Sequence, residues 1–209
     1  MLFDIGGVLE MTPDTGWREA WCERLNIDRS EMDEKAGAIW RAGGIGSVTL
    51  DEVRRGTAEA LGLTADELRE LFEDIWQEYL GTLNTELADF FTGLRPRYRT
   101  GILSNSFVGA RERERLAYNF EAMCDVVVYS HEEGMQKPDA RFFRLVCERL
   151  GVAPEDVVFV DDAEVCVDAA RGLGMKVVRF VDNDQVIGDI MRYLGESRTW
   201  DRHIRDGSL

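Results

Sequence analysis

Five short apolar segments, each followed by at least one helical pattern, constrain the fold of this chain more than any other sequence feature. The segments are residues 1–5, 98–106, 125–129, 157–162 and 176–181. Strands that alternate with helices are joined by right-handed crossovers, which place the strands parallel and cover both faces of the sheet. The sequence therefore predicts an α/β fold with a doubly wound parallel sheet.

A long stretch without a convincing strand separates the first segment from the second. Residues 14–82 have the pattern of four helices, and two of these begin with a capping box, in Thr49–Glu52 and Thr64–Glu67. We therefore predict a helical block inserted into the α/β unit. The tryptophans of this stretch are interpreted as the block's own hydrophobic core; they are Trp17, Trp21, Trp40 and Trp76.

These patterns divide the chain into two parts. The predicted core consists of residues 1–13 and 86–209, and the inserted block consists of residues 14–85. The length of 209 residues suits one hydrophobic core with an inserted subdomain. Residues 196–209 are polar and carry no clear pattern, so we expect a loosely held tail.

The charge of the chain limits its ligands. Forty acidic residues against 25 basic ones give a formal net charge of −15, which repels nucleic acid and anionic membranes. A phosphate ester would also be repelled, so an anion site requires local cations or a metal ion. The cysteines form no CxxC pair, and no segment is apolar enough to span a membrane. We therefore expect a cytoplasmic protein without nucleic-acid or membrane partners.

The ends of the predicted strands, and the loops that follow them, deliver polar residues to one edge of the sheet. They are Asp4, Ser104 with Asn105, Lys137, and Asp161 with Asp162. Residues at the carboxyl ends of parallel strands can meet even when they lie far apart in sequence. Clustered carboxylates suit a hard cation such as Mg²⁺, and a lysine beside them can neutralise a phosphoryl group.

These motifs, in this order, resemble the four signature motifs of the haloacid dehalogenase-like (HAD) hydrolase superfamily, in its branch of phosphatases with a helical cap. The resemblance implies a Rossmann-like core with an inserted α-helical cap, here residues 14–85. It places Asp4 on the nucleophile, Ser104 on the phosphate-binding hydroxyl, Lys137 on the lysine, and Asp161 with Asp162 on the metal-binding pair. Asn105, Gly6 and Gly7 are expected to contact the phosphoryl group, and Asp4 and the Gly6 carbonyl to bind Mg²⁺.

One position departs from the family pattern. Most phosphatases of the family carry a second aspartate two residues after the nucleophile, where this chain has Gly6. Glycine cannot transfer a proton, so the rate should fall steeply as the leaving group becomes more basic, unless another acid substitutes. The candidates for that acid are Glu10, Asp14 and His131.

The resemblance implies a Mg²⁺-dependent phosphomonoesterase that acts on a small phosphorylated metabolite through an aspartyl-phosphate on Asp4; a homodimer is a possible assembly. Two alternatives stay open at this point. The first is a metal-free hydrolase of the same fold, such as a dehalogenase, because relatives with that chemistry also lack the second aspartate; Asp161 and Asp162 argue against it. The second is a catalytically weak binding or regulatory module that has lost its acid.

Overall fold

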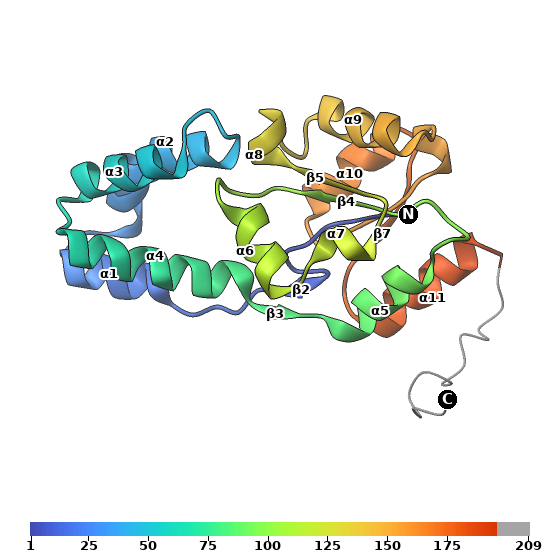
Figure 1. Ribbon diagram of the computed structural model, residues 1–209, viewed down its shortest axis with the longest axis horizontal. Coiled ribbons are helices and arrows are strands. Elements are labelled where there is room, and N and C mark those ends of the chain that lie inside the picture. Colours follow the sequence, from blue (N-terminus) through green and yellow to red (C-terminus); the bar gives the residue numbers. More distant parts are fainter. Residues whose placement is uncertain (196–209) are drawn as a thin grey trace.

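The computed structural model describes residues 1–195 and shows an elongated molecule with a helical insertion at one end and an α/β unit at the other (Figure 1). The expected tail, residues 196–209, lies outside the described residues.

Five parallel strands form the sheet within the described part of the chain, in the order β5-β4-β1-β6-β7. The order changes direction at β1, as in a doubly wound fold, so the predicted fold class is confirmed. The central position of β1 places its carboxyl end between those of β4 and β6. The strands are β1 (Leu2–Phe3), β4 (Gly101–Ser104), β5 (Val126–Tyr129), β6 (Val158–Asp161) and β7 (Lys176–Arg179).

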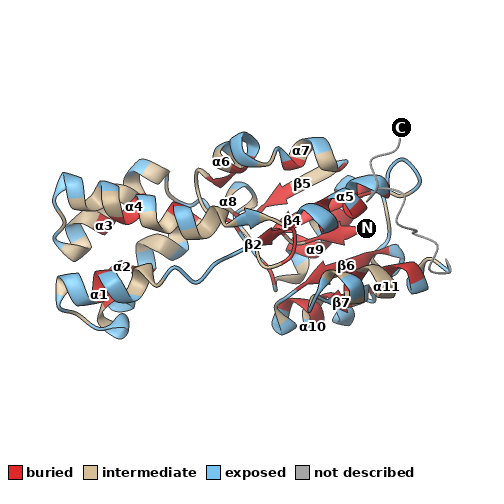
Figure 2. Ribbon diagram, turned by 90° about the horizontal axis from the view of Figure 1, so that it is seen from below, coloured by how far each residue is buried: buried red, intermediate tan, exposed pale blue. Residues whose placement is uncertain are grey.

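Helices cover both faces of the sheet, and alternate side chains of each strand pack on opposite faces. Leu2 and Phe159 contribute to one hydrophobic cluster, whereas Phe3 and Val160 contribute to the other. Figure 2 shows the buried residues concentrated in the strands. The covering helices are α9 (Ala140–Leu150) and α10 (Glu164–Gly172) on one face, and α5 (Thr85–Gly93), α7 (Phe120–Met123) and α11 (Asn183–Tyr193) on the other.

The insertion consists of helices, as predicted. Both predicted capping boxes are present: the Thr49 and Thr64 side chains accept the amides of Glu52 and Glu67, whose carboxylates bond back. Between residues 14 and 84, all of which are described, the helices are α1 (Trp17–Leu25), α2 (Arg29–Gly44), α3 (Leu50–Leu61) and α4 (Ala65–Leu80). The chain enters and leaves through a short antiparallel ribbon formed by β2 (Glu10–Met11) and β3 (Thr82–Leu83).

The insertion packs on the core through two elements of the core, α6 (Ala110–Ala117) and α8 (Ser130–Glu133). Phe72 and Trp76 of α4 share a hydrophobic cluster with Ala110 of α6. At the end of α2, the Ser130 hydroxyl donates a hydrogen bond of 2.7 Å to the carbonyl of Gly44. These contacts fix the insertion above the carboxyl edge of the sheet.

Helix α9 begins at Ala140 and is capped by the side chain of Asp139. The cis peptide between Lys137 and Pro138 belongs to the loop that precedes this cap. A separate 3₁₀ turn, Pro154–Asp156, leads into β6. Among residues 1–195, no helix combines the length and apolar character needed to cross a membrane.

Candidate active site

Asp4 follows the last residue of β1 and is fixed by its own backbone. Its amide donates 2.9 Å to the carbonyl of Val160 in β6, so the residue is held at the sheet edge. Its Oδ1 accepts the amide of Ile5 at 2.8 Å. The side chain is 13% exposed and therefore accessible to a ligand.

Lys137 bridges Asp4 and the end of β6. Its Nζ lies 2.8 Å from Asp4 Oδ2 and 2.7 Å from Asp161 Oδ2, and its side chain is only 1% exposed. Burial disfavours the charged ammonium, but Asp4 and Asp161 outweigh this effect and raise the pKa of Lys137. The side chain is therefore a fixed positive charge between two carboxylates.

Asp4, Asp161 and Asp162 form a carboxylate cluster whose ligand atoms lie within 4.8 Å of one another. Asp161 is fully buried, and its Oδ1 accepts the amide of Ala163 at 2.9 Å, whereas Asp162 is exposed. Gly7 lets Asp162 approach: its φ is +71°, and a Cβ there would lie 2.6 Å from Asp162 Oδ2. The structure therefore brings these three aspartates together, as the strand ends predict.

The donor set of this cluster fits Mg²⁺. Three carboxylates face a single ammonium, so negative charge is in excess, and the donors are the hard oxygens that Mg²⁺ prefers. Burial raises the pKa of Asp4 to about 7, although Lys137 opposes this shift. A bound cation would favour the ionised carboxylate. The Gly6 carbonyl remains a predicted fourth ligand.

Ser104 and Asn105 lie on the neighbouring strand end. Ser104 closes β4 and is 3% exposed. The Asn105 side chain joins two loops, because its Nδ2 donates 2.9 Å to the Lys137 carbonyl and its Oδ1 accepts the Lys137 amide at 2.7 Å. These bonds position Lys137. Phosphoryl binding by Ser104, Asn105, Gly6 and Gly7 stays a prediction.

Of the three candidates for the missing acid, Glu10 lies nearest to Gly6. A Cβ on Gly6 would lie 3.9 Å from Glu10 Oε2 and 3.8 Å from Thr12 Oγ1. Glu10 is 1% exposed; Thr12 donates 2.8 Å to its Oε2, and its Oε1 has no hydrogen-bond partner among residues 1–195. Burial raises the pKa of Glu10 to about 7, with the Thr12 hydroxyl opposing the shift.

The other two candidates are held elsewhere. Asp14 is exposed and accepts the amide of Gly16 at 3.1 Å. His131 bonds through Nδ1 to the Ser106 hydroxyl at 2.6 Å, and burial lowers the pKa of its imidazole.

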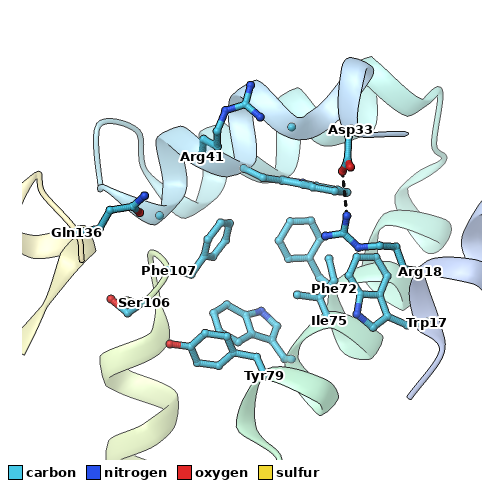
Figure 3. A pocket seen from close by; sticks show the side chains of 14 residues that line it. Trp17, Arg18, Asp33, Arg41, Phe72, Ile75, Tyr79, Ser106, Phe107 and Gln136 are labelled. Atoms are coloured by element: carbon cyan, nitrogen blue, oxygen red, sulfur yellow. Dashed lines mark hydrogen bonds and ion pairs between the residues drawn. The ribbon is translucent and has the colours of Figure 1, made fainter. Parts of the chain in front are cut away.

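A cavity of about 410 Å³ lies where the insertion meets the core (Figure 3). Its residues come from α1, α2, α4 and the loops on either side of the site. The sequence interpretation treated the tryptophans of the insertion as core. Trp21 does belong to a buried cluster, but Trp17, Trp40 and Trp76 also line this cavity. No sequence pattern reveals such a space, because it depends on how three helices pack above two loops.

Comparison with known proteins gives consistent results. The sequence matches the family of haloacid dehalogenase-like hydrolases over residues 1–174. Phosphatase MT3486 of Mycobacterium tuberculosis is 32% identical, with 93% of this chain and 92% of that protein covered. A HAD-family enzyme of Bacteroides thetaiotaomicron, solved with magnesium and inorganic phosphate, superimposes with a TM-score of 0.75 at 23% identity, covering 89% of this chain and 96% of that chain.

A further relative is longer than this chain. Bifunctional epoxide hydrolase 2 of Sus scrofa is 25% identical over 93% of this chain, which spans only 38% of the length of that protein. The comparison therefore concerns one part of the larger protein. Because the family match covers residues 1–174 and the mycobacterial phosphatase aligns along nearly its whole length, this chain belongs to the haloacid dehalogenase-like hydrolases.

Proposed function

We propose that this hydrolase is a Mg²⁺-dependent phosphomonoesterase that acts on a small phosphorylated molecule. The observation that carries the proposal is the position of Lys137, whose ammonium contacts Asp4 and Asp161 beside the third carboxylate, Asp162. This arrangement supports the proposal because it gathers a candidate nucleophile, a fixed cation and candidate metal ligands around one point.

The reaction would proceed in two displacements. An oxygen of Asp4 attacks phosphorus, the bond from phosphorus to the ester oxygen breaks, and the leaving oxygen takes a proton from Glu10, the candidate acid beside Gly6, to form the alcohol. Water then attacks phosphorus of the aspartyl-phosphate, returns a proton to Glu10, and releases inorganic phosphate and the free carboxylate. Lys137 neutralises charge on the phosphoryl oxygens throughout, and the Ser104 hydroxyl donates to one of them.

Mg²⁺ would be held by Asp4, the Gly6 carbonyl and Asp162, with Asp161 orienting the site through its bonds to Lys137 and Ala163. When bound, the ion supplies additional positive charge to the transferred group. The net charge of −15 makes such local cations necessary for an anionic substrate, and it disfavours nucleic acid.

We further propose that the insertion acts as a cap over the site, with residues 14–85 as its extent. The carboxylate cluster favours this function over a metal-free dehalogenase, in which the single ammonium of Lys137 would have to compensate three carboxylates. It likewise favours an enzyme over a binding module, since the nucleophile and its cation are both retained.

The test is hydrolysis of p-nitrophenyl phosphate by wild type and Asp4→Asn, with and without Mg²⁺. We expect turnover in wild type with Mg²⁺, and a loss of at least about a thousandfold in the variant, because an amide is a poor nucleophile. Circular dichroism checks that the variant is folded. Equal rates in the two proteins would contradict the role of Asp4. Activity of wild type that does not respond to Mg²⁺ or to a chelator would contradict the metal.

A further inference from the structure

Two residues that line the cavity between insertion and core are close in sequence to proposed site residues. Ser106 follows the Ser104-Asn105 pair, and Gln136 precedes Lys137; both line the cavity at its core end (Figure 3). The opposite end is lined by Arg18 and Asp33, which form an ion pair of 2.9 Å (Figure 3). A molecule held at the site by a phosphoryl group could therefore extend from the core end toward this ion pair.

The walls between these ends are mainly aromatic. They include Trp17, Trp40, Phe72, Trp76, Tyr79 and Phe107. Two of the indole N–H groups are already used: Trp17 donates 3.0 Å to Glu78 Oε1, and Trp40 donates 3.0 Å to Thr57 Oγ1. Trp76 differs, because its residue is 7% exposed and its buried Nε1 has no hydrogen-bond partner in the described part of the chain.

We propose, resting on the phosphomonoesterase function above, that this cavity binds the leaving group of the substrate, and that this group is an apolar, ring-containing alcohol with one hydrogen-bond acceptor for Trp76. The phosphoryl end would lie at Lys137, and the carbon skeleton would lie against the aromatic walls. A volume of about 410 Å³ is within the usual range for a small-molecule site.

This assignment excludes polyol phosphates as good substrates. Each hydroxyl group of a polyol would lose its hydrogen bonds to water, and the aromatic walls offer few replacements. An apolar group gains free energy from the same burial. The unpartnered N–H of Trp76 can donate a hydrogen bond to an acceptor at one position only.

The experiment compares naphthylethyl phosphate with ribitol 5-phosphate. Both are phosphate monoesters of a primary alcohol, so their leaving groups have similar chemistry. With Mg²⁺ present, we expect kcat/KM to be about a hundredfold higher for the naphthyl ester, since a large apolar group is buried. Equal or higher kcat/KM for ribitol phosphate would overturn the proposal while leaving the phosphatase function intact.

Two variants test the location. Gly44 lines the cavity at its core end, and a Cβ there would lie 3.7 Å from the Ser106 carbonyl oxygen and 3.9 Å from Gln136 Oε1, so a side chain can be accommodated. Gly44→Leu should lower kcat/KM more for the naphthyl ester than for methyl phosphate. At Gly188, in α11, no atom lies within 4 Å of the Cβ position, so Gly188→Leu is the matched control. An equal loss for both esters in Gly44→Leu would contradict the proposal.

Trp76→Phe keeps an aromatic ring but removes the N–H donor together with the five-membered ring of the indole, so the test compares two esters within this one variant. We expect kcat/KM to fall about fivefold for a methoxy-substituted naphthylethyl ester, and to change little for its ethyl-substituted counterpart. Equal effects on the two esters would contradict the assigned hydrogen bond.

Binding separates this proposal from the function on which it rests. Calorimetry with naphthylethanol, the product alcohol, needs no catalysis. Binding to wild type that is weakened in Gly44→Leu supports the cavity assignment even if no phosphate ester is hydrolysed. Absence of binding to wild type would overturn it even if p-nitrophenyl phosphate is hydrolysed.

Discussion

Lys137 sets the electrostatics of the site because its ammonium contacts Asp4 and Asp161 at once. Its removal would leave two carboxylates without their cation, one of them fully buried, and such a loss typically costs about 3–5 kcal/mol of stability. Asp162 belongs to the same cluster but is exposed, so it can be changed without this cost. It is therefore the better residue for testing metal binding.

We predict that Asp162→Ala removes most Mg²⁺ affinity and most activity, and that it changes the free energy of unfolding by less than about 1 kcal/mol. Isothermal calorimetry with Mg²⁺ measures the first effect, and urea unfolding measures the last. Asp156→Ala removes an exposed carboxylate outside the cluster and is the control for net charge. Unchanged Mg²⁺ binding in Asp162→Ala would mean that the metal assignment is wrong.

The second prediction at this scale concerns the proton missing at Gly6. Glu10 lies beside the position that an aspartate side chain would take, so the structure replaces the sequence-based expectation of a steep leaving-group dependence with a shallow one. Glu10→Gln should make the dependence steep, with the largest losses for primary alkyl phosphates. Phosphate esters of graded leaving-group pKa measure this slope. A steep slope in wild type that Glu10→Gln leaves unchanged would exclude Glu10.

The turn after β1 shows how one short element positions two functional groups. It begins directly after Asp4 and brings Gly7 against Asp162. A residue with a side chain at position 7 faces both a left-handed backbone conformation, with φ of +71°, and an overlap with the Asp162 carboxylate. The glycine is thus required by the carboxylate cluster as well as by the turn.

We predict that Gly7→Ala lowers stability by about 1–2 kcal/mol and also weakens Mg²⁺ binding, because the new methyl group displaces Asp162. Gly174→Ala is the matched control: its φ is +89°, but no atom lies within 4 Å of its Cβ position. It should lose similar stability and keep its Mg²⁺ affinity. Unfolding curves and calorimetry on both variants provide the comparison, and equal Mg²⁺ affinities in the two would refute the contact argument.

Sequence periodicity was sufficient for the long elements and insufficient for the short ones. The sheet strands and the capped helices of the insertion were predictable, because apolar spacing and the Thr49 and Thr64 caps are local signals. Strands β2 and β3 have two residues each, and helices α7 and α8 have four residues each. Elements this short contain no periodic pattern that could be detected. The sequence predicts that the Lys137 loop follows a strand, but the bonds from Asn105 that hold this loop depend on tertiary structure.

At the scale of the molecule, the insertion and the core are also joined by a buried polar cluster. Glu114 of α6 accepts a short hydrogen bond from Tyr129 of β5, and it lies beside Tyr79 of α4. Glu114 is 2% exposed. The arginines and glutamates that surround it in sequence are typical of a solvated helix face, so the charge pattern does not mark Glu114 as buried. Only the packing of α6 between insertion and sheet makes it an interior group.

This burial predicts how stability depends on pH. Burial raises the pKa of Glu114 from an ordinary value of 4.5 to about 7, with Tyr129 and Tyr79 opposing the shift. Between these pH values the folded state keeps a proton that the unfolded state has lost, so unfolding releases a proton and stability falls as pH rises. The stabilisation is fully present below pH 4.5 and is lost by about pH 7, a change of about 3 kcal/mol at most.

Glu114→Gln removes the titrating group and keeps a side chain of the same shape. We expect the unfolding free energy of wild type, relative to this variant, to decrease by up to about 3 kcal/mol from pH 4 to pH 8. Urea unfolding at a series of pH values measures this difference, in which the contributions of all other groups cancel. Glu112→Gln, exposed on the same helix, should follow wild type at every pH. Parallel curves for wild type and Glu114→Gln would contradict this prediction, because they would show that the pKa of Glu114 is the same in the folded and the unfolded chain. A carboxyl group that is buried beside two tyrosines should have different pKa values in these two states.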